Sequence, residues 1–266
     1  MIRFCLLLIS LTLLSCNKSQ PTYNRDHQAD FDTILNAQNM SGVILIYDPQ
    51  TQTYYSNDFE LAKKSILPAS TFKIPNTIIA LETQVMQSDT TMILWDGQQR
   101  AFDIWEKDMT LREAFQASCV PCYQEIARKI GVKNMTAYLS KLGFGDMDVT
   151  DQNIDLFWLT GKSNISPMEQ ISFLERFLTK KLPILDRTRE LMLKIFKVEE
   201  TNDYIFSGKS GLSDSNNGWY VGYLQKGSQT YYFALNANPV DTTKMETFVP
   251  GRKEAIYSAL KTLQIL

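Results

Sequence analysis

The sequence predicts a mixed α/β fold of the α+β type, in which one antiparallel sheet is formed by both ends of the chain and is flanked by terminal helices. Two observations predict it. Runs of β-branched and aromatic residues occupy residues 42–58 and recur after residue 204. Between them, apolar residues recur every three or four positions, which is the spacing of helices. The composition, 44% hydrophobic and 21% charged over 266 residues, is sufficient for one sizeable core.

The elements follow in order along the chain. Residues 42–58 (GVILIYDPQTQTYYSND) predict two strands separated by a turn at Asp48–Pro49. Apolar spacing then predicts helices over residues 111–130, 135–142, 167–178 and 186–196. From Tyr204, short aromatic segments separated by Gly, Asn and Ser predict an antiparallel meander, and residues 252–263 predict a closing amphipathic helix.

No repeat or Gly/Ser-rich linker divides this region, so residues 31–266 are expected to form a single domain. Its sheet subdomain would comprise about 31–66 and 200–266, and its helical subdomain about 67–199. A groove between two such halves is a natural binding site.

The N-terminus is expected to lie outside the fold. Arg3 precedes the apolar residues 4–14, which are few for a membrane span, and L-L-S-C follows. This ending resembles a bacterial lipoprotein signal, which implies removal of residues 1–15 and lipidation of Cys16. A plain secretory signal with an incidental cysteine, or an uncleaved anchor, is the alternative. Residues 16–30 would form a tether, and the protein would be exported to the periplasm of a Gram-negative-type bacterium.

Charge and histidine content exclude several classes of function. The net charge is −2 and no long basic run occurs, so a nucleic-acid partner is not expected. The only histidine is His27, in the predicted tether, where a solvated polar residue is the simplest interpretation. Ser-His-Asp catalysis and histidine-based zinc sites are therefore excluded, and no metal is expected.

A serine nucleophile would then need another base, and lysine is the candidate. The pattern S-x-x-K occurs at Ser15–Lys18, Ser70–Lys73 and Ser258–Lys261. Only the middle copy has a suitable setting, because Pro75 marks the first turn of a helix and places Ser70 and Lys73 on one face of its N-terminus. Backbone amides at such an end favour negative charge.

Further motifs follow Ser70-Thr71-Phe72-Lys73 in a fixed order. They are Ser118-Cys119-Val120, F-W-L-T-G at 157–161, Lys209-Ser210-Gly211, G-W-Y-V-G at 218–222 and the arginine Arg252 of P-G-R-K. In this combination the chain resembles the class D (oxacillinase-type) serine β-lactamases over nearly all of its length after the signal. The resemblance implies the fold shared by β-lactamases and penicillin-binding transpeptidases. No S-D-N triplet or E-x-x-L-N segment occurs, so other branches of these enzymes fit less well.

The resemblance implies a role for each residue. Ser70 would attack the amide carbonyl of a β-lactam, with its own backbone amide and that of Leu212 as the oxyanion hole. Ser118 would pass a proton to the lactam nitrogen. The substrate carboxylate would be held by the K-S-G strand, namely Lys209, Ser210 and Gly211, together with Arg252.

For Lys73 the resemblance implies a modified base. A lysine at its ordinary pKa is a cation and accepts no proton, but burial lowers that pKa. In the family the neutral amine takes up carbon dioxide as a carbamate (N6-carboxylysine), so bicarbonate is required although no cofactor is. Trp158 would donate its indole N–H to the carbamate, inside a pocket formed with Phe72, Val120 and Leu159.

Simpler structural interpretations remain for several of these residues. Trp158 could be an aromatic core residue, and Lys209 an edge-strand lysine before a turn. Arg252 could face solvent at the start of a helix. Ser118 could be the N-cap of a helix that begins near Pro121, with or without a catalytic role.

Two features depart from the family pattern. The family's aromatic-Gly-Asn loop is Phe144-Gly145-Asp146 here, which puts the geometry of that loop in question. Cys119 and Cys122 form a C-x-x-C beside Ser118, and they could form a disulfide in an exported protein or remain two buried thiols.

Two other functions share these motifs. A penicillin sensor domain stays acylated as a signal, but such domains end a multi-span membrane protein. A cell-wall transpeptidase usually carries S-x-N where this chain has S-x-V. The sequence therefore favours an enzyme that hydrolyses a small-molecule β-lactam, with a membrane contact only through the N-terminal lipid.

Overall fold

The computed structural model describes residues 23–266. The predicted signal peptide, Cys16 and the Ser15–Lys18 copy of S-x-x-K lie outside these residues. No helix in the described part of the chain is long and apolar enough to cross a membrane.

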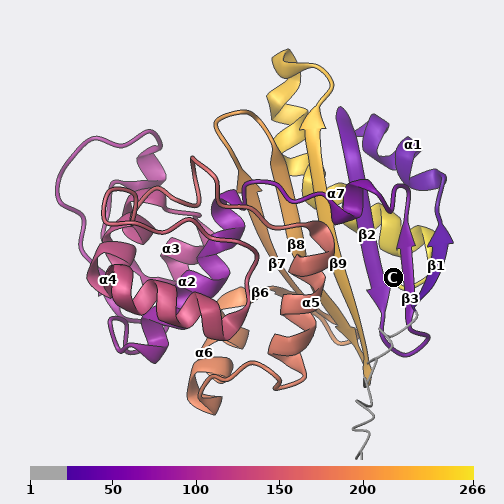
Figure 1. Ribbon diagram of the computed structural model, residues 1–266. Coiled ribbons are helices and arrows are strands. Elements are labelled where there is room, and N and C mark those ends of the chain that lie inside the picture. Colours follow the sequence, from indigo (N-terminus) through magenta and orange to yellow (C-terminus); the bar gives the residue numbers. More distant parts are fainter. Residues whose placement is uncertain (1–22) are drawn as a thin grey trace, which may run out of the picture.

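A seven-stranded sheet joins the two ends of the chain (Figure 1). All neighbouring strands are antiparallel except β1 and β3, which are parallel. This arrangement confirms the predicted fold class. The strand order across the sheet is β1 (Asn24–His27), β3 (Thr53–Ser56), β2 (Met40–Asp48), β9 (Gln229–Pro239), β8 (Gly218–Lys226), β7 (Ile205–Leu212) and β6 (Lys197–Glu200).

The helices cover both faces of the sheet (Figure 1). One face packs against α1 (Asp30–Ala37) and α7 (Met245–Thr262). The helical part of the chain lies on the other face and contains α2 (Lys73–Glu82), α3 (Leu111–Gln116), α4 (Val120–Leu142), α5 (Pro167–Leu178) and α6 (Asp186–Phe196). Shorter elements are the 3₁₀ turns Leu61–Lys63, Ala69–Phe72, Asp103–Trp105 and Thr242–Lys244, and the strand pair β4 (Met92–Ile93) and β5 (Met109–Thr110).

The centre of strand β2, residues 43–47, carries apolar side chains at every position. Val43 and Leu45 belong to the core on the helical side, whereas Ile44 and Ile46 belong to the core beneath α1 and α7. Because both faces of the sheet are covered, the strand has no polar alternation. The two cores together hold the sheet rigidly between its helical layers.

Three predictions from the sequence need correction. Residues Asn24–His27 are not part of a tether but form β1, an exposed edge strand whose backbone pairs with β3. Backbone pairing needs no apolar side chains, so the hydrophobic pattern gave no signal. The helix predicted over 111–130 is broken at residues 117–119, and the closing helix begins at Met245 and continues through Pro250.

Candidate active site

Ser70 and Lys73 lie where the 3₁₀ turn Ala69–Phe72 runs into α2. The Lys73 Nζ donates a hydrogen bond to the Ser70 Oγ over 2.8 Å. The three-residue spacing places both side chains on one face, and Pro75 in the first turn lets the helix begin there. By contrast, Ser258 and Lys261 lie late in α7, where Lys261 is exposed.

Two buried side chains from distant elements hold this turn. The Trp219 Nε1 of β8 donates to the Leu67 carbonyl (2.9 Å), and the Gln170 Nε2 of α5 donates to the Thr71 Oγ1 (2.8 Å). The Thr71 hydroxyl in turn donates to the Pro68 carbonyl (2.7 Å). The sequence analysis missed Gln170, although a glutamine on the apolar face of residues 167–178 was a usable signal.

Lys73 is completely buried. None of the ion pairs among residues 23–266 involves it. Burial, and secondly the charge of Lys209, hold the pKa of the Lys73 amine well below its ordinary value. The ring of Tyr123, which the sequence analysis also missed, lies 5.2 Å from the Lys73 Nζ. Its signal was weak, because a tyrosine on a helix is usually a core residue.

Trp158 packs against Phe72, the residue immediately before Lys73. Its ring stacks on Phe72 with the centroids 5.3 Å apart, and both side chains are fully buried. The indole Nε1 is buried without a hydrogen-bond partner in the described structure. Such an orphaned donor is costly, so it indicates a site for an acceptor. Of the other predicted pocket residues, Val120 and Leu159 are only partly buried.

Asn76, one helical turn beyond Lys73, carries a second orphaned group. Its side chain is completely buried, and its Oδ1 has no hydrogen-bond partner in the described structure. A polar residue among the apolar positions of α2 was a signal that the sequence analysis did not use.

Ser118 and Lys209 meet across 91 residues of chain. The Lys209 Nζ donates to the Ser118 Oγ (3.0 Å) and to the Ser210 carbonyl (2.9 Å). Ser118 occupies the break between α3 and α4 with a left-handed φ of 53°. The interpretation of Ser118 as an N-cap is wrong, because the N-cap of α4 is Cys119.

The K-S-G strand lies directly against the nucleophile turn. A Cβ on Gly211 would lie 3.3 Å from the Pro68 carbonyl oxygen and from the Thr71 Cγ2, so glycine permits this close approach. Leu212, the next residue, is the last residue of β7. A cleft of about 360 Å³ opens beside the strand. It is lined by residues including Phe115, Phe196, Lys209, Ser210 and Tyr220.

Arg252 projects from α7 toward the same strand. It is 4% exposed, so the interpretation of a solvent-facing arginine is wrong. Its guanidinium donates to the carbonyl of Gly211, and its Nε donates to the Val249 carbonyl (3.1 Å). A Cβ on Gly218 would lie 2.8 Å from the Arg252 Cδ, so the glycine of G-W-Y-V-G leaves room for this side chain.

Comparisons with known proteins show which family this chain belongs to. Residues 19–252 match the family model of the penicillin-binding protein transpeptidase domain. The chain is 37% identical to β-lactamase OXA-10 of Pseudomonas aeruginosa over 79% of this chain and 81% of that protein. The chain belongs to the class D β-lactamase family.

Solved structures of this family have the same fold. The class D β-lactamase YbXI from Nostoc superposes with a TM-score of 0.84 at 38% identity, covering 89% of this chain and 99% of the other. The class D β-lactamase from Sebaldella termitidis superposes with a TM-score of 0.87 at 30% identity, covering 92% of this chain and 100% of the other.

This class D chain has Asp146 where the family's aromatic-Gly-Asn loop has Asn, and the backbone of the loop is still paired with Asn164. The Asp146 amide donates to the Asn164 carbonyl (2.9 Å), and the Asn164 amide donates back (2.8 Å). The Asp146 side chain is exposed. Gly145 has φ 54°, and a Cβ there would lie 2.3 Å from the Asn164 oxygen, so glycine is the residue that this loop requires.

The cysteine pair is a disulfide. Cys119 and Cys122 are joined across the first turn of α4, which decides between the two alternatives that the sequence left open. Among residues 23–266 no cluster of His, Cys, Asp and Glu could hold a metal ion.

The lowered pKa of Lys209 predicts how the stability of the protein depends on pH. Burial, with the charge of Arg252, lowers this pKa to about 7, whereas an unfolded lysine titrates near 10.4. Between these values the unfolded chain binds more protons, so the free energy of unfolding should rise with pH, by up to about 1.4 kcal/mol per unit. Urea unfolding at pH 7 and pH 9 should show this rise, and Lys209→Met should reduce it. A fall in stability across this range would contradict the burial of a neutral amine.

Proposed function

We propose that this protein hydrolyses the amide bond of β-lactam antibiotics through a covalent acyl-serine intermediate on Ser70. The observation that carries the proposal is the bond from the Lys73 Nζ to the Ser70 Oγ (2.8 Å) inside a fully buried pocket. A serine hydroxyl needs a base within such reach. An amine with a lowered pKa is available as that base or as a carbon dioxide acceptor.

We infer that Lys73 works as its carbamate. The neutral amine adds to carbon dioxide and releases a proton, which leaves an anionic oxygen near Ser70. The orphaned Nε1 of Trp158 supports this, because it would gain the acceptor that it lacks. The pocket also holds Phe72, fully buried, and Leu159, partly buried, whose apolar groups disfavour the lysine cation.

In acylation, the base on Lys73 takes the Ser70 proton while the Oγ attacks the lactam carbonyl. The amides of Ser70 and Leu212 would stabilise the oxyanion. Ser118, held by Lys209, would then pass its hydroxyl proton to the lactam nitrogen as the ring opens. It would recover a proton from the protonated base on Lys73, which frees that base for deacylation. In deacylation the same base activates water, which releases Ser70.

The substrate's carboxylate would bind at the K-S-G strand. Lys209, Ser210 and Arg252 lie together there, and an anion would compensate two cations that have no acidic partner among the described ion pairs. Fixed charges in a buried site bind such a group strongly. Binding of the anion would also favour the protonated form of Lys209.

Turnover of a chromogenic β-lactam, measured with and without added bicarbonate, tests the proposal. We expect many turnovers per enzyme and a higher rate with bicarbonate. Stable one-to-one labelling of Ser70 without turnover, even with bicarbonate present, would overturn hydrolysis in favour of a sensor or transpeptidase role. Turnover that is indifferent to bicarbonate depletion would overturn the carbamate.

A further inference from the structure

The Cys119–Cys122 disulfide closes the first turn of α4 immediately after Ser118. Both cysteines are at least nine-tenths buried. The Cys119 Sγ also accepts a hydrogen bond from the Cys122 amide (3.2 Å), so the same sulfur caps the helix. The bond therefore fixes where α4 begins and how the chain enters it.

Ser118 needs such a constraint on both sides. Its φ of 53° lies in the left-handed region, which a serine adopts only where the surroundings impose it. On the N-terminal side, the Ser118 and Cys119 amides donate to the carbonyls of Phe115 (3.1 Å) and Ala114 (2.9 Å) at the end of α3. On the C-terminal side, the first turn of α4, which the disulfide closes, constrains the backbone of Ser118.

Cleavage of the bond would disturb this geometry. Bonded sulfurs lie about 2 Å apart, but non-bonded ones need roughly 3.5 Å or more. Cys119 is 1% exposed and packs in the main core, but both cysteines also line a cavity, so the separating sulfurs would move toward that cavity. Without the bond, nothing covalent closes the turn that carries Ser118 and Val120, and we expect the Ser118 hydroxyl to move relative to the Lys209 amine.

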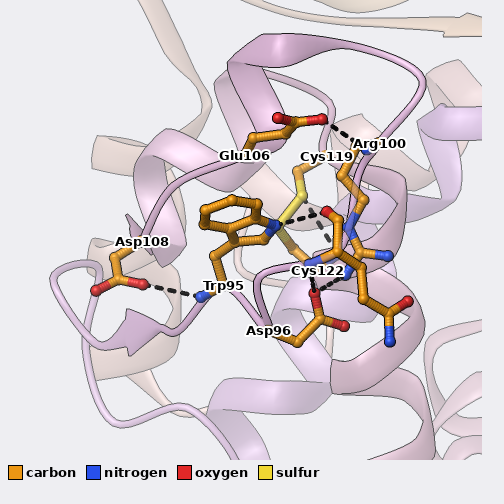
Figure 2. Close-up of polar contacts among 8 residues, drawn as sticks. Trp95, Asp96, Arg100, Glu106, Asp108, Cys119 and Cys122 are labelled. Atoms are coloured by element: carbon orange, nitrogen blue, oxygen red, sulfur yellow. Dashed lines mark hydrogen bonds and ion pairs between the residues drawn. A yellow bond between two sulfur atoms is a disulfide. The ribbon is translucent and has the colours of Figure 1, made fainter.

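The disulfide borders a cavity separate from the cleft beside the K-S-G strand. A second cavity of about 350 Å³ is lined by both cysteines and by the loop of residues 93–107. Figure 2 shows the disulfide beside this loop, which is braced by the bonds from the Trp95 amide to Asp108 (2.8 Å) and from the Arg100 amide to Glu106 (2.7 Å). The lining carries charges of both signs, since Arg100 is ion-paired with Asp96 and Arg128 with Asp155.

We propose that the Cys119–Cys122 disulfide is a positioning element of the active site, which holds the Ser118 hydroxyl opposite Lys209, so that the acylation rate depends on its oxidation state. The proposal rests on the proposed attack of Ser70 on a β-lactam. With a dithiol, one thiolate bonds to the Cys122 sulfur and the Cys119 thiolate leaves. The second thiol then displaces Cys122, so that the protein gains two electrons and two protons and the dithiol becomes a disulfide.

The test compares the oxidised and reduced forms of the full chain. The protein is reduced with dithiothreitol, freed of it under nitrogen, and its thiols are counted before pre-steady-state acylation by a chromogenic β-lactam. We expect reduction to lower the acylation rate about tenfold, reoxidation to restore it, and deacylation, which depends on Lys73, to change less than twofold. The Cys119→Ala/Cys122→Ala protein, treated identically, should not respond.

The same reduction experiment on the Ser118→Ala variant separates an effect on the position of the Ser118 hydroxyl from a general loss of active-site structure. Without the hydroxyl, reduction should change acylation less than twofold. A tenfold loss of acylation rate on reduction of Ser118→Ala would overturn the inference. So would an unchanged acylation rate in a wild-type protein shown to be reduced. If the oxidised protein is not acylated at all, the proposed function fails instead. Should the double-alanine variant not fold, the reduced and reoxidised wild type still decide the question.

Discussion

Lys73→Ala is expected to abolish turnover, with a loss of at least about a thousandfold in kcat/KM. General-base catalysis contributes roughly 10²–10⁴-fold, and Lys73 would serve in both half-reactions. No histidine could replace it, since the only one, His27, lies on the exposed strand β1. Steady-state hydrolysis of a chromogenic β-lactam measures the effect.

The matched control is Lys64→Ala. Lys64 is an exposed lysine shortly before the nucleophile turn, so its removal should leave turnover unchanged. Circular dichroism and thermal unfolding of both variants separate loss of chemistry from loss of fold. Hydrolysis by Lys73→Ala within tenfold of wild type would rule out this lysine as the base.

Trp158→Phe should raise the bicarbonate concentration needed for half-maximal activity by about 10- to 100-fold. Phenylalanine keeps a ring to stack on Phe72 but lacks the indole N–H, which has no other partner in the described structure. A hydrogen bond to a charged group is worth about 1.5–3 kcal/mol, which corresponds to that change in the stability of a carbamate. Turnover measured across a bicarbonate series gives the half-saturation value.

Trp95→Phe provides the comparison. The Trp95 indole also donates one hydrogen bond, to the Gln98 carbonyl (2.8 Å), but it lies on the loop beside the disulfide cavity (Figure 2). Loss of this hydrogen bond in Trp95→Phe should leave the bicarbonate concentration for half-maximal activity unchanged. An unchanged half-saturation in Trp158→Phe would mean that Trp158 is only a core aromatic residue.

Local patterns predicted much of the secondary structure. The helices Pro167–Leu178 and Asp186–Phe196 match the predicted ranges, because each carries an uninterrupted apolar face that only a helix can bury. The meander after Tyr204 followed from its β-branched and aromatic segments. The break at residues 117–119 was missed because apolar spacing continues across it, whereas the left-handed Ser118 has no pattern in the sequence.

The sequence by itself determined which chemistry was available: a serine and a lysine on one helical turn, and a single histidine, His27, far from them in the chain. Only the tertiary structure decided that Lys73 is fully desolvated, that Arg252 is buried and that Ser118 faces Lys209. The physical reason is that desolvation depends on groups brought together from distant parts of the chain. A pKa is set by the surroundings in space, and the order of residues along the chain describes only the neighbours in sequence.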